Sequence, residues 1–162
     1  MMAFSCASIA RYAKDIVRAV LITTLTSLNS YAEINPPKLE STGMYRIQIR
    51  FGEQVITAEL DNTPSTQDFI KQLPMTLDFE DYGATEKIAY PHAKLSTQDA
   101  PEGVTPVTGD IAYYSPWGNL ALFYRDFSYS KDLIRLGRIT SGLEHLQQLD
   151  SSQATLELIS NE

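Results

Sequence analysis

The chain has 162 residues, which is long enough for one domain with a hydrophobic core. Hydrophobic residues make up 43% of it and charged residues 20%, as in an ordinary soluble globular protein. The formal net charge of −7 argues against nucleic acid as a partner, because phosphate binding needs a basic patch and the sequence has none.

The beginning of the chain has the features of a secretory signal. Basic residues precede an apolar run at 19–28, and small residues allow signal peptidase to cut after Ala32. The run is too short to cross a bilayer core of roughly 30 Å. We therefore expect a signal peptide over residues 1–32 and a periplasmic or secreted mature protein without a membrane span. The alternative is a start codon placed too early, with a cytoplasmic domain that opens at Met44. Cys6 is the only cysteine, so the chain forms no internal disulfide.

The folded part follows a linker. Residues 33–43 combine a Pro-Pro pair with small polar residues, which predicts an extended segment. The next stretch, MYRIQIRF at 44–51, alternates apolar and polar side chains, so it predicts a half-buried strand. A tight turn leads to a partner strand at 54–62. We therefore place a single domain at 44–162.

Two short helices interrupt the strands that follow. The first lies within 63–74 and is expected to have Ser65 or Thr66 as its N-cap. The second covers 141–149, with Ser141 as N-cap of a capping box. The remaining strands are expected at 75–83, 86–90, 111–115, 119–126, 132–139 and 154–160. So many short strands predict a mainly β fold, a closed barrel with one helix at each end.

Several stretches resemble cyclophilins. The strand–turn–helix opening of cyclophilins is matched by Asp61, Pro64, Thr66 and Phe69, and their last strand and helix by Gly137, Arg138, Ile139 and Gly142. The stretches LPMTLDFEDYGATEKI, GDIAYYSPWGNLALFYRDFSYS and LIRLGRI resemble more closely the small bacterial cyclophilin-like proteins of unassigned function. This resemblance covers about residues 44–159. It implies a cyclophilin-like barrel of about eight strands with two short capping helices.

The residues on which cyclophilin isomerases depend are not carried over. The segment that corresponds to their catalytic arginine and glutamine, at 75–94, contains neither residue type. The position of their histidine falls near Leu133, and that of their indole near 127–129, which is FSY here. The catalytic arginine is a charge-assisted hydrogen-bond donor, which is stronger than a neutral one. A chain without this arginine should therefore be a weaker isomerase. The catalytic residues are therefore left unassigned.

The stretch 109–127 supplies most of the candidate ligand-binding residues. Strand alternation assigns Ile111, Tyr113, Leu120 and Leu122 to the core. Tyrosine and tryptophan carry a polar atom that suits the edge of a cleft, and a tryptophan in a turn is hard to bury. The candidate ligand-binding residues from this stretch are Tyr114, Trp117, Tyr124 and Phe127. The resemblance adds Tyr82 and Glu86, in a segment that neighbours the same strands.

Three functions remain open. The first is a binding module whose aromatic groove holds an extended peptide or a small molecule. The second is a weak or divergent peptidyl-prolyl cis-trans isomerase. The third is an enzyme for a small molecule, which would use the acidic residues of 78–86 and nearby arginines. Acidic residues in alternation usually form a solvated strand face, and the histidines lack ligand partners, so we expect no metal site and no cofactor.

Overall fold

The computed structural model describes residues 44–150 and 152–159. The strands are β1 (Met44–Phe51), β2 (Gln54–Asp61), β3 (Met75–Tyr82), β4 (Glu86–Ala89), β5 (Gly103–Val104), β6 (Asp110–Tyr114), β7 (Asn119–Phe123), β8 (Ser130–Lys131), β9 (Leu133–Ser141) and β10 (Ser152–Leu158). The helices are α1 (Pro64–Ile70) and α2 (Leu143–Leu146). The signal peptide and linker that the sequence predicts lie outside the described residues.

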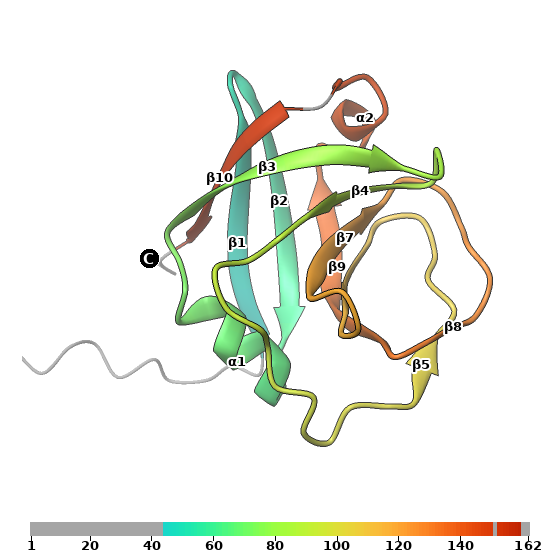
Figure 1. Ribbon diagram of the computed structural model, residues 1–162. Helices are drawn as coiled ribbons and strands as arrows, with labels where there is room; N and C mark the ends of the chain where they lie inside the picture. The colour runs from blue at the N-terminus through green and yellow to red at the C-terminus, as the bar shows by residue number, and fades with distance from the viewer. Residues whose placement is uncertain (1–43, 151, 160–162) are drawn as a thin grey trace, which may run out of the picture. The chain divides into compact units, whose positions relative to one another are not determined.

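Eight of the described strands close into one antiparallel barrel (Figure 1). Their order around the barrel is β1-β10-β3-β4-β7-β6-β9-β2, and β5 and β8 form a separate two-stranded sheet. Closure leaves no unpaired edge among these eight strands, which removes a common site of aggregation. The prediction of a mainly β closed barrel is confirmed. No helix within 44–150 or 152–159 is long and apolar enough to cross a membrane.

The barrel interior is filled by the side chains that strand alternation predicts. In β1, Ile47, Ile49 and Phe51 are buried, at 0%, 0% and 4% exposure. The four core residues expected in β6 and β7 are buried as well: Ile111, Tyr113, Leu120 and Leu122. In β1, β6 and β7, alternate residues therefore belong to one hydrophobic cluster.

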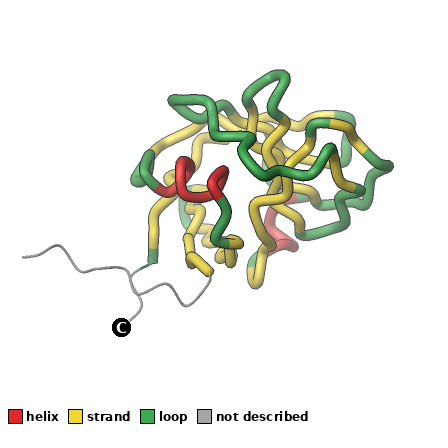
Figure 2. Tube along the Cα trace, turned by 90° about the horizontal axis from the view of Figure 1, so that it is seen from below, coloured by secondary structure: helices red, strands yellow, loops and turns green. Residues whose placement is uncertain are grey.

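One helix lies at each end of the barrel, as expected. Figure 1 shows α1 at the lower end and α2 at the upper end, and Figure 2 looks onto the end that α1 covers. Phe69 of α1 and Leu146 of α2 are both fully buried and belong to the central cluster. The helices therefore bury apolar side chains of the two open ends.

The first helix begins earlier than the sequence suggested. Its N-cap is Thr63, whose side-chain oxygen accepts a hydrogen bond from the backbone N–H of Thr66 at 3.2 Å. The prediction of Ser65 or Thr66 was wrong because Pro64 occupies the first helical position, where a missing N–H costs nothing. The hydroxyl of Ser65 donates instead to the carbonyl oxygen of Ser96 at 2.6 Å.

The second helix is a single turn without the predicted capping box. Ser141 is the last residue of β9, and its hydroxyl lies 2.6 Å from that of Thr57 on β2. The N-cap is Gly142 with a φ of 82° and no side-chain cap. A Cβ at this position would lie 2.5 Å from the carbonyl oxygen of Val55, so both the backbone conformation and the space require glycine.

A second apolar layer covers part of the outside of the barrel. All five residues of β7 are buried, and the four apolar ones divide between two clusters by strand alternation. Leu120 and Leu122 face the interior, whereas Ala121 and Phe123 face outward. The outer cluster consists of Ile88, Ala112, Ala121, Phe123 and Leu133, with Val104 and Tyr114 packed against it. This layer is the base on which the candidate site is built.

Candidate functional site

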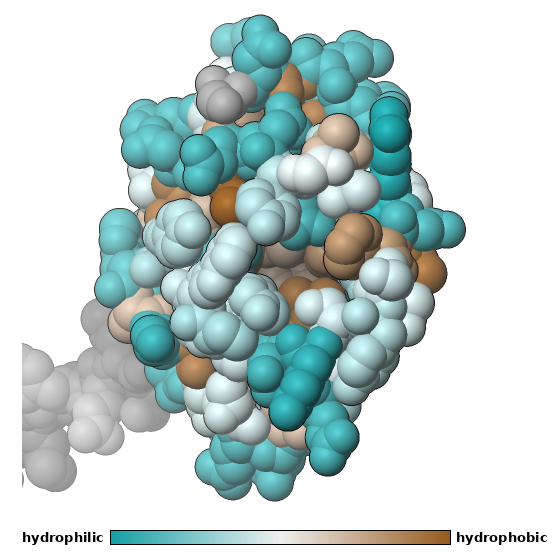
Figure 3. All heavy atoms as spheres, turned by 45° about the vertical axis from the view of Figure 1, so that its right-hand side comes forward, coloured by the Kyte–Doolittle hydropathy of each residue, from teal (hydrophilic) through white to brown (hydrophobic). Residues whose placement is uncertain are grey.

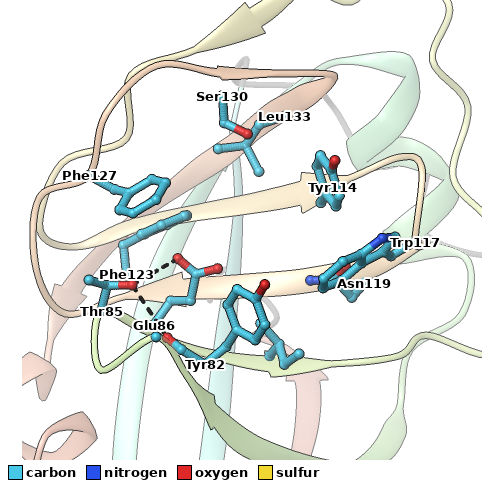
Figure 4. Close-up of a pocket in the computed structure, with 12 residues that line it drawn as sticks. Tyr82, Thr85, Glu86, Tyr114, Trp117, Asn119, Phe123, Phe127, Ser130 and Leu133 are labelled. Atoms are coloured by element: carbon cyan, nitrogen blue, oxygen red, sulfur yellow. Dashed lines mark hydrogen bonds between the residues drawn. The ribbon is translucent and has the colours of Figure 1, made fainter.

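A cavity of about 270 Å³ opens on the outer apolar layer (Figure 4). It lies over the outer faces of β4, β6 and β7 and is bordered by residues that precede β9. Figure 3 shows this side of the molecule, where a hollow has a hydrophobic floor. The residues that line the cavity are Tyr82, Gly83, Thr85, Glu86, Ile88, Tyr114, Trp117, Asn119, Phe123, Phe127, Ser130 and Leu133. We call this cavity the aromatic pocket.

The floor of the aromatic pocket comes from the outer layer. Phe123, Ile88 and Leu133 line it, and they are 2%, 3% and 3% exposed. Because β4 pairs with β7 in antiparallel register, Glu86 lies opposite Phe123. Strand alternation then places Glu86 and Ile88 on the same outer face, two residues apart.

Three aromatic rings form one wall of the pocket. The ring of Trp117 meets Tyr82 edge to face at a centroid distance of 5.5 Å, and it meets Tyr114 in the same way at 5.5 Å. The turn between β6 and β7 holds Trp117 in place, because the N–H of Gly118 donates to the carbonyl oxygen of Tyr114 at 2.8 Å. Gly118 has a φ of 77°, which favours glycine.

The pocket wall is open to solvent on its outer side. Tyr82, Trp117 and Phe127 are 46%, 51% and 48% exposed, although each is large and aromatic. Exposed apolar groups that gather around a cavity are uncommon on a monomer and mark binding surfaces. The aromatic pocket is therefore the strongest candidate site in the described part of the chain.

Glu86 brings a carboxyl group into this apolar setting. Figure 4 shows its carboxylate pointing into the cavity between the rings of Phe127 and Tyr82. The hydroxyl of Thr85 donates to it at 3.4 Å. Burial raises the pKa of Glu86, and the hydrogen bond from Thr85 opposes this only in part.

Five of the six candidate ligand-binding residues surround the aromatic pocket. They are Tyr82, Glu86, Tyr114, Trp117 and Phe127. The structure places Tyr124 elsewhere: it is 7% exposed and packs in the central cluster, because alternation from Leu122 turns it inward. Its hydroxyl donates to Asp81 at 3.0 Å, and burial together with this hydrogen bond raises the pKa of Tyr124.

Sequence reasoning missed part of the lining. Asn119, Ser130 and Thr85 contribute polar atoms to the pocket, and none of them belongs to a recognisable motif. Phe123 also lines the pocket and was not among the candidates. The sequence feature that could have identified Phe123 is the absence of any polar residue in β7 after Asn119, which indicates that both faces of the strand are covered.

The acidic residues of 78–86 do not gather in one site. Asp81 pairs with Lys87 at 2.9 Å, and Gln153 donates to Asp78 at 3.1 Å, whereas Glu86 alone points into the pocket. No group of three histidine, cysteine or acidic residues in the described ranges is placed to hold a metal ion.

A second cavity of about 470 Å³ lies beside β9. Its charged groups neutralise one another, since Arg135 pairs with Asp61 at 3.5 Å and Arg138 with Asp110 at 3.1 Å. Because these charges are already paired, this cavity offers a charged ligand less than the aromatic pocket does, where Glu86 has no charged partner.

Comparison with known proteins supports the fold and assigns no activity. The solution structure of a hypothetical protein from Archaeoglobus fulgidus is similar, with a TM-score of 0.53 and 21% sequence identity over 74% of this chain and 98% of that chain. No curated protein matches the sequence. Residues 49–158 match the family described as the cyclophilin-like family. With this match over most of the barrel and the closed eight-stranded topology, the chain belongs to the cyclophilin-like family.

Proposed function

We propose that this protein is a binding module whose aromatic pocket holds a small molecule or one side chain of an extended peptide. The observation that carries the proposal is the gathering of exposed Tyr82, Trp117 and Phe127 around one cavity with a buried apolar floor. Small-molecule sites are typically concave, mostly apolar and supplied with a few polar groups. Glu86 and Asn119 supply such groups here.

The size of the pocket limits its occupant. A volume of about 270 Å³ is below the roughly 300–1,000 Å³ of drug-sized sites. A peptide would therefore insert one side chain and leave its backbone on the surface. The lining contains no arginine or lysine that could donate a charge-assisted hydrogen bond to a prolyl amide, and this favours binding over proline isomerisation.

Trp117 is the only tryptophan of the chain, so its fluorescence reports on the pocket directly. We would titrate the protein with a panel of amino acids, nucleosides, sugars and blocked tripeptides. A ligand of the pocket should change the emission of the wild type and bind at least about tenfold more weakly to Tyr82→Ala, which loses one ring of the wall. Tyr90→Ala is the matched control, because Tyr90 is 52% exposed and does not line the pocket.

Two results would contradict the binding proposal. The first is the absence of any emission change or thermal shift across the whole panel. The second is rapid cis-trans isomerisation of a proline peptide that is lost in Trp117→Ala, which would make the protein a divergent isomerase.

We also propose that residues 1–32 are a signal peptide and that the mature protein is periplasmic or secreted. The basic residues, the short apolar run and the small residues before the cut support this proposal. N-terminal sequencing of exported protein tests it. A first residue of Glu33 is expected, and an uncleaved chain or a start at Met44 would contradict it.

A further inference from the structure

The aromatic pocket has a negative charge and nothing to balance it. Among its lining residues, all of them in the described part of the chain, Glu86 alone carries a carboxyl group, and none is lysine, arginine or histidine. No basic side chain of the described residues lies within 4.0 Å of the Glu86 carboxylate. The neighbouring Lys87 is unable to help, because strand alternation turns it to the opposite face, where it pairs with Asp81.

This carboxylate is partly desolvated as well as unpaired. Its one side-chain hydrogen bond comes from Thr85 at 3.4 Å, which is long. Burial raises its pKa, which means that the site disfavours the negative charge in the absence of a partner. A cation placed beside Glu86 would reverse that effect.

The aromatic rings favour the same kind of ligand. The face of an aromatic ring carries negative electrostatic potential and attracts a cation within about 6 Å of its centre. Tyr82, Tyr114 and Trp117 form one connected wall, and Phe127 lies on the other side of the Glu86 carboxylate (Figure 4). A cation in this space would meet several rings and one carboxylate.

Asn119 adds a second acceptor. It lines the pocket and is 2% exposed, and its Oδ1 is buried with no hydrogen-bond partner among the described residues. An unpartnered buried acceptor is unfavourable and calls for a donor. Primary ammonium groups supply three N–H donors, whereas a quaternary ammonium supplies none.

We infer that the aromatic pocket binds a primary alkylammonium group, such as a lysine side chain or a small free amine, held between the rings and paired with Glu86. This inference rests on the proposed function and deepens it by naming the ligand class. The alkyl stem packs on Phe123 and Ile88 at the floor, and the ammonium group reaches the carboxylate. The net charge of −7 favours the approach of a cation.

The test compares two blocked amino acids that differ only in the ammonium group. Nα-acetyl-lysine N-methylamide carries the ammonium group, and Nα-acetyl-norleucine N-methylamide has a similar stem without it. We expect calorimetric titration to show that the lysine probe binds about tenfold or more tightly than the norleucine probe, since a desolvated cation gains from both rings and carboxylate. In Glu86→Gln, the ratio should fall severalfold, because only the rings then favour the cation. Glu53→Gln is the matched control, because it removes one negative charge at the turn between β1 and β2 and should keep the ratio.

A third probe separates the two sources of the ammonium group. If n-butylammonium binds as tightly as the blocked lysine, the ligand is a free amine. If it binds much more weakly, the blocked backbone contributes and the ligand is a peptide. Either result agrees with the inference, provided that Glu86→Gln weakens the binding.

The inference and the proposed function fail in different ways. Equal binding of the lysine and norleucine probes to the wild type, or a ratio that Glu86→Gln leaves unchanged, would overturn the inference and leave a general binding pocket. If none of these amines binds but another member of the panel does, the inference is again overturned alone. If no compound of any class binds, the proposed function fails with it.

Discussion

The ion pair between the buried Lys87 and the partly exposed Asp81 provides a quantitative test of the barrel. The side chain of Lys87 is 1% exposed, and its Nζ lies 2.9 Å from Asp81 Oδ1 and 2.5 Å from the carbonyl oxygen of Leu149. The side chain of Asp81 is 47% exposed and also accepts a hydrogen bond from Tyr124 at 3.0 Å. The two partners are therefore buried to very different degrees, and removing one should not cost the same as removing the other.

Replacing the acid should be the more damaging change. Asp81→Asn leaves the ammonium of Lys87 buried without a counter-ion, and we expect a loss of about 3 kcal/mol, at the lower end of values for broken buried pairs. Lys87→Met removes the ammonium together with its desolvation penalty, and Asp81 can turn to water. What remains is the unpaired carbonyl of Leu149, so we expect a loss of about 1–2 kcal/mol.

Urea unfolding followed by far-UV circular dichroism measures these losses, from midpoints at an unchanged m-value. The double variant Lys87→Met/Asp81→Asn should be about as stable as Lys87→Met alone, because once the ammonium is gone the remaining partner of Asp81 is the Tyr124 hydroxyl, whose hydrogen bond an asparagine side-chain oxygen can also accept. The reasoning would be refuted if Lys87→Met were the less stable single variant, or if the two losses added in the double variant.

Three further predictions concern other parts of the chain. Gly137→Ala should cost about 3 kcal/mol or prevent folding, because its Cβ would lie 2.1 Å from the carbonyl oxygen of Glu59; Gly52→Ala, with a φ of 55° but no atom within 4 Å, should cost only about 1–2 kcal/mol in the same unfolding assay. Thr63→Ala removes the N-cap of α1 and should cost about 1 kcal/mol, and an unchanged urea midpoint would contradict this. The raised pKa of Glu86 means that the folded state binds its proton more tightly than the unfolded chain, so stability falls as pH rises past the unfolded value of about 4.3. Glu86→Gln should therefore be more stable than the wild type at pH 7 and lose that advantage toward about pH 4, and a constant difference across this range would contradict a raised pKa of Glu86.

Alternation in the sequence was a reliable guide to the barrel but not to every side chain. It identified the strand MYRIQIRF and the inward residues of β6 and β7, because a half-buried strand has a period of two. Alternation was less informative about which side chains of β7 point inward, because apolar residues occupy both faces of that strand. Tyr124 was selected as a pocket residue for its polar atom, but the same period that carries Leu122 inward carries Tyr124 with it.

The helix caps show another limit. Thr63, Ser65 and Thr66 are all suitable N-cap residues, and the position of Pro64 separates them only once the helix is known to start there. At α2, the hydroxyl of Ser141 is taken by Thr57 on the neighbouring strand, a contact between residues 84 positions apart. A local capping pattern contains no information about such a contact.

The sequence by itself indicated where most barrel strands lie along the chain and many of the side chains that fill the barrel, because these follow from alternation and turn residues that act over a few positions. The fold family came from the resemblance to cyclophilin-like proteins. Only the tertiary structure decided that Glu86 faces an apolar cavity while its neighbour Lys87 is buried with Asp81. Closing the barrel sets which face of β4 is inside, and pairing β4 with β7 brings Glu86 opposite Phe123, 37 residues further along the chain. The pocket is a product of these long-range pairings, and no local pattern in the sequence encodes them.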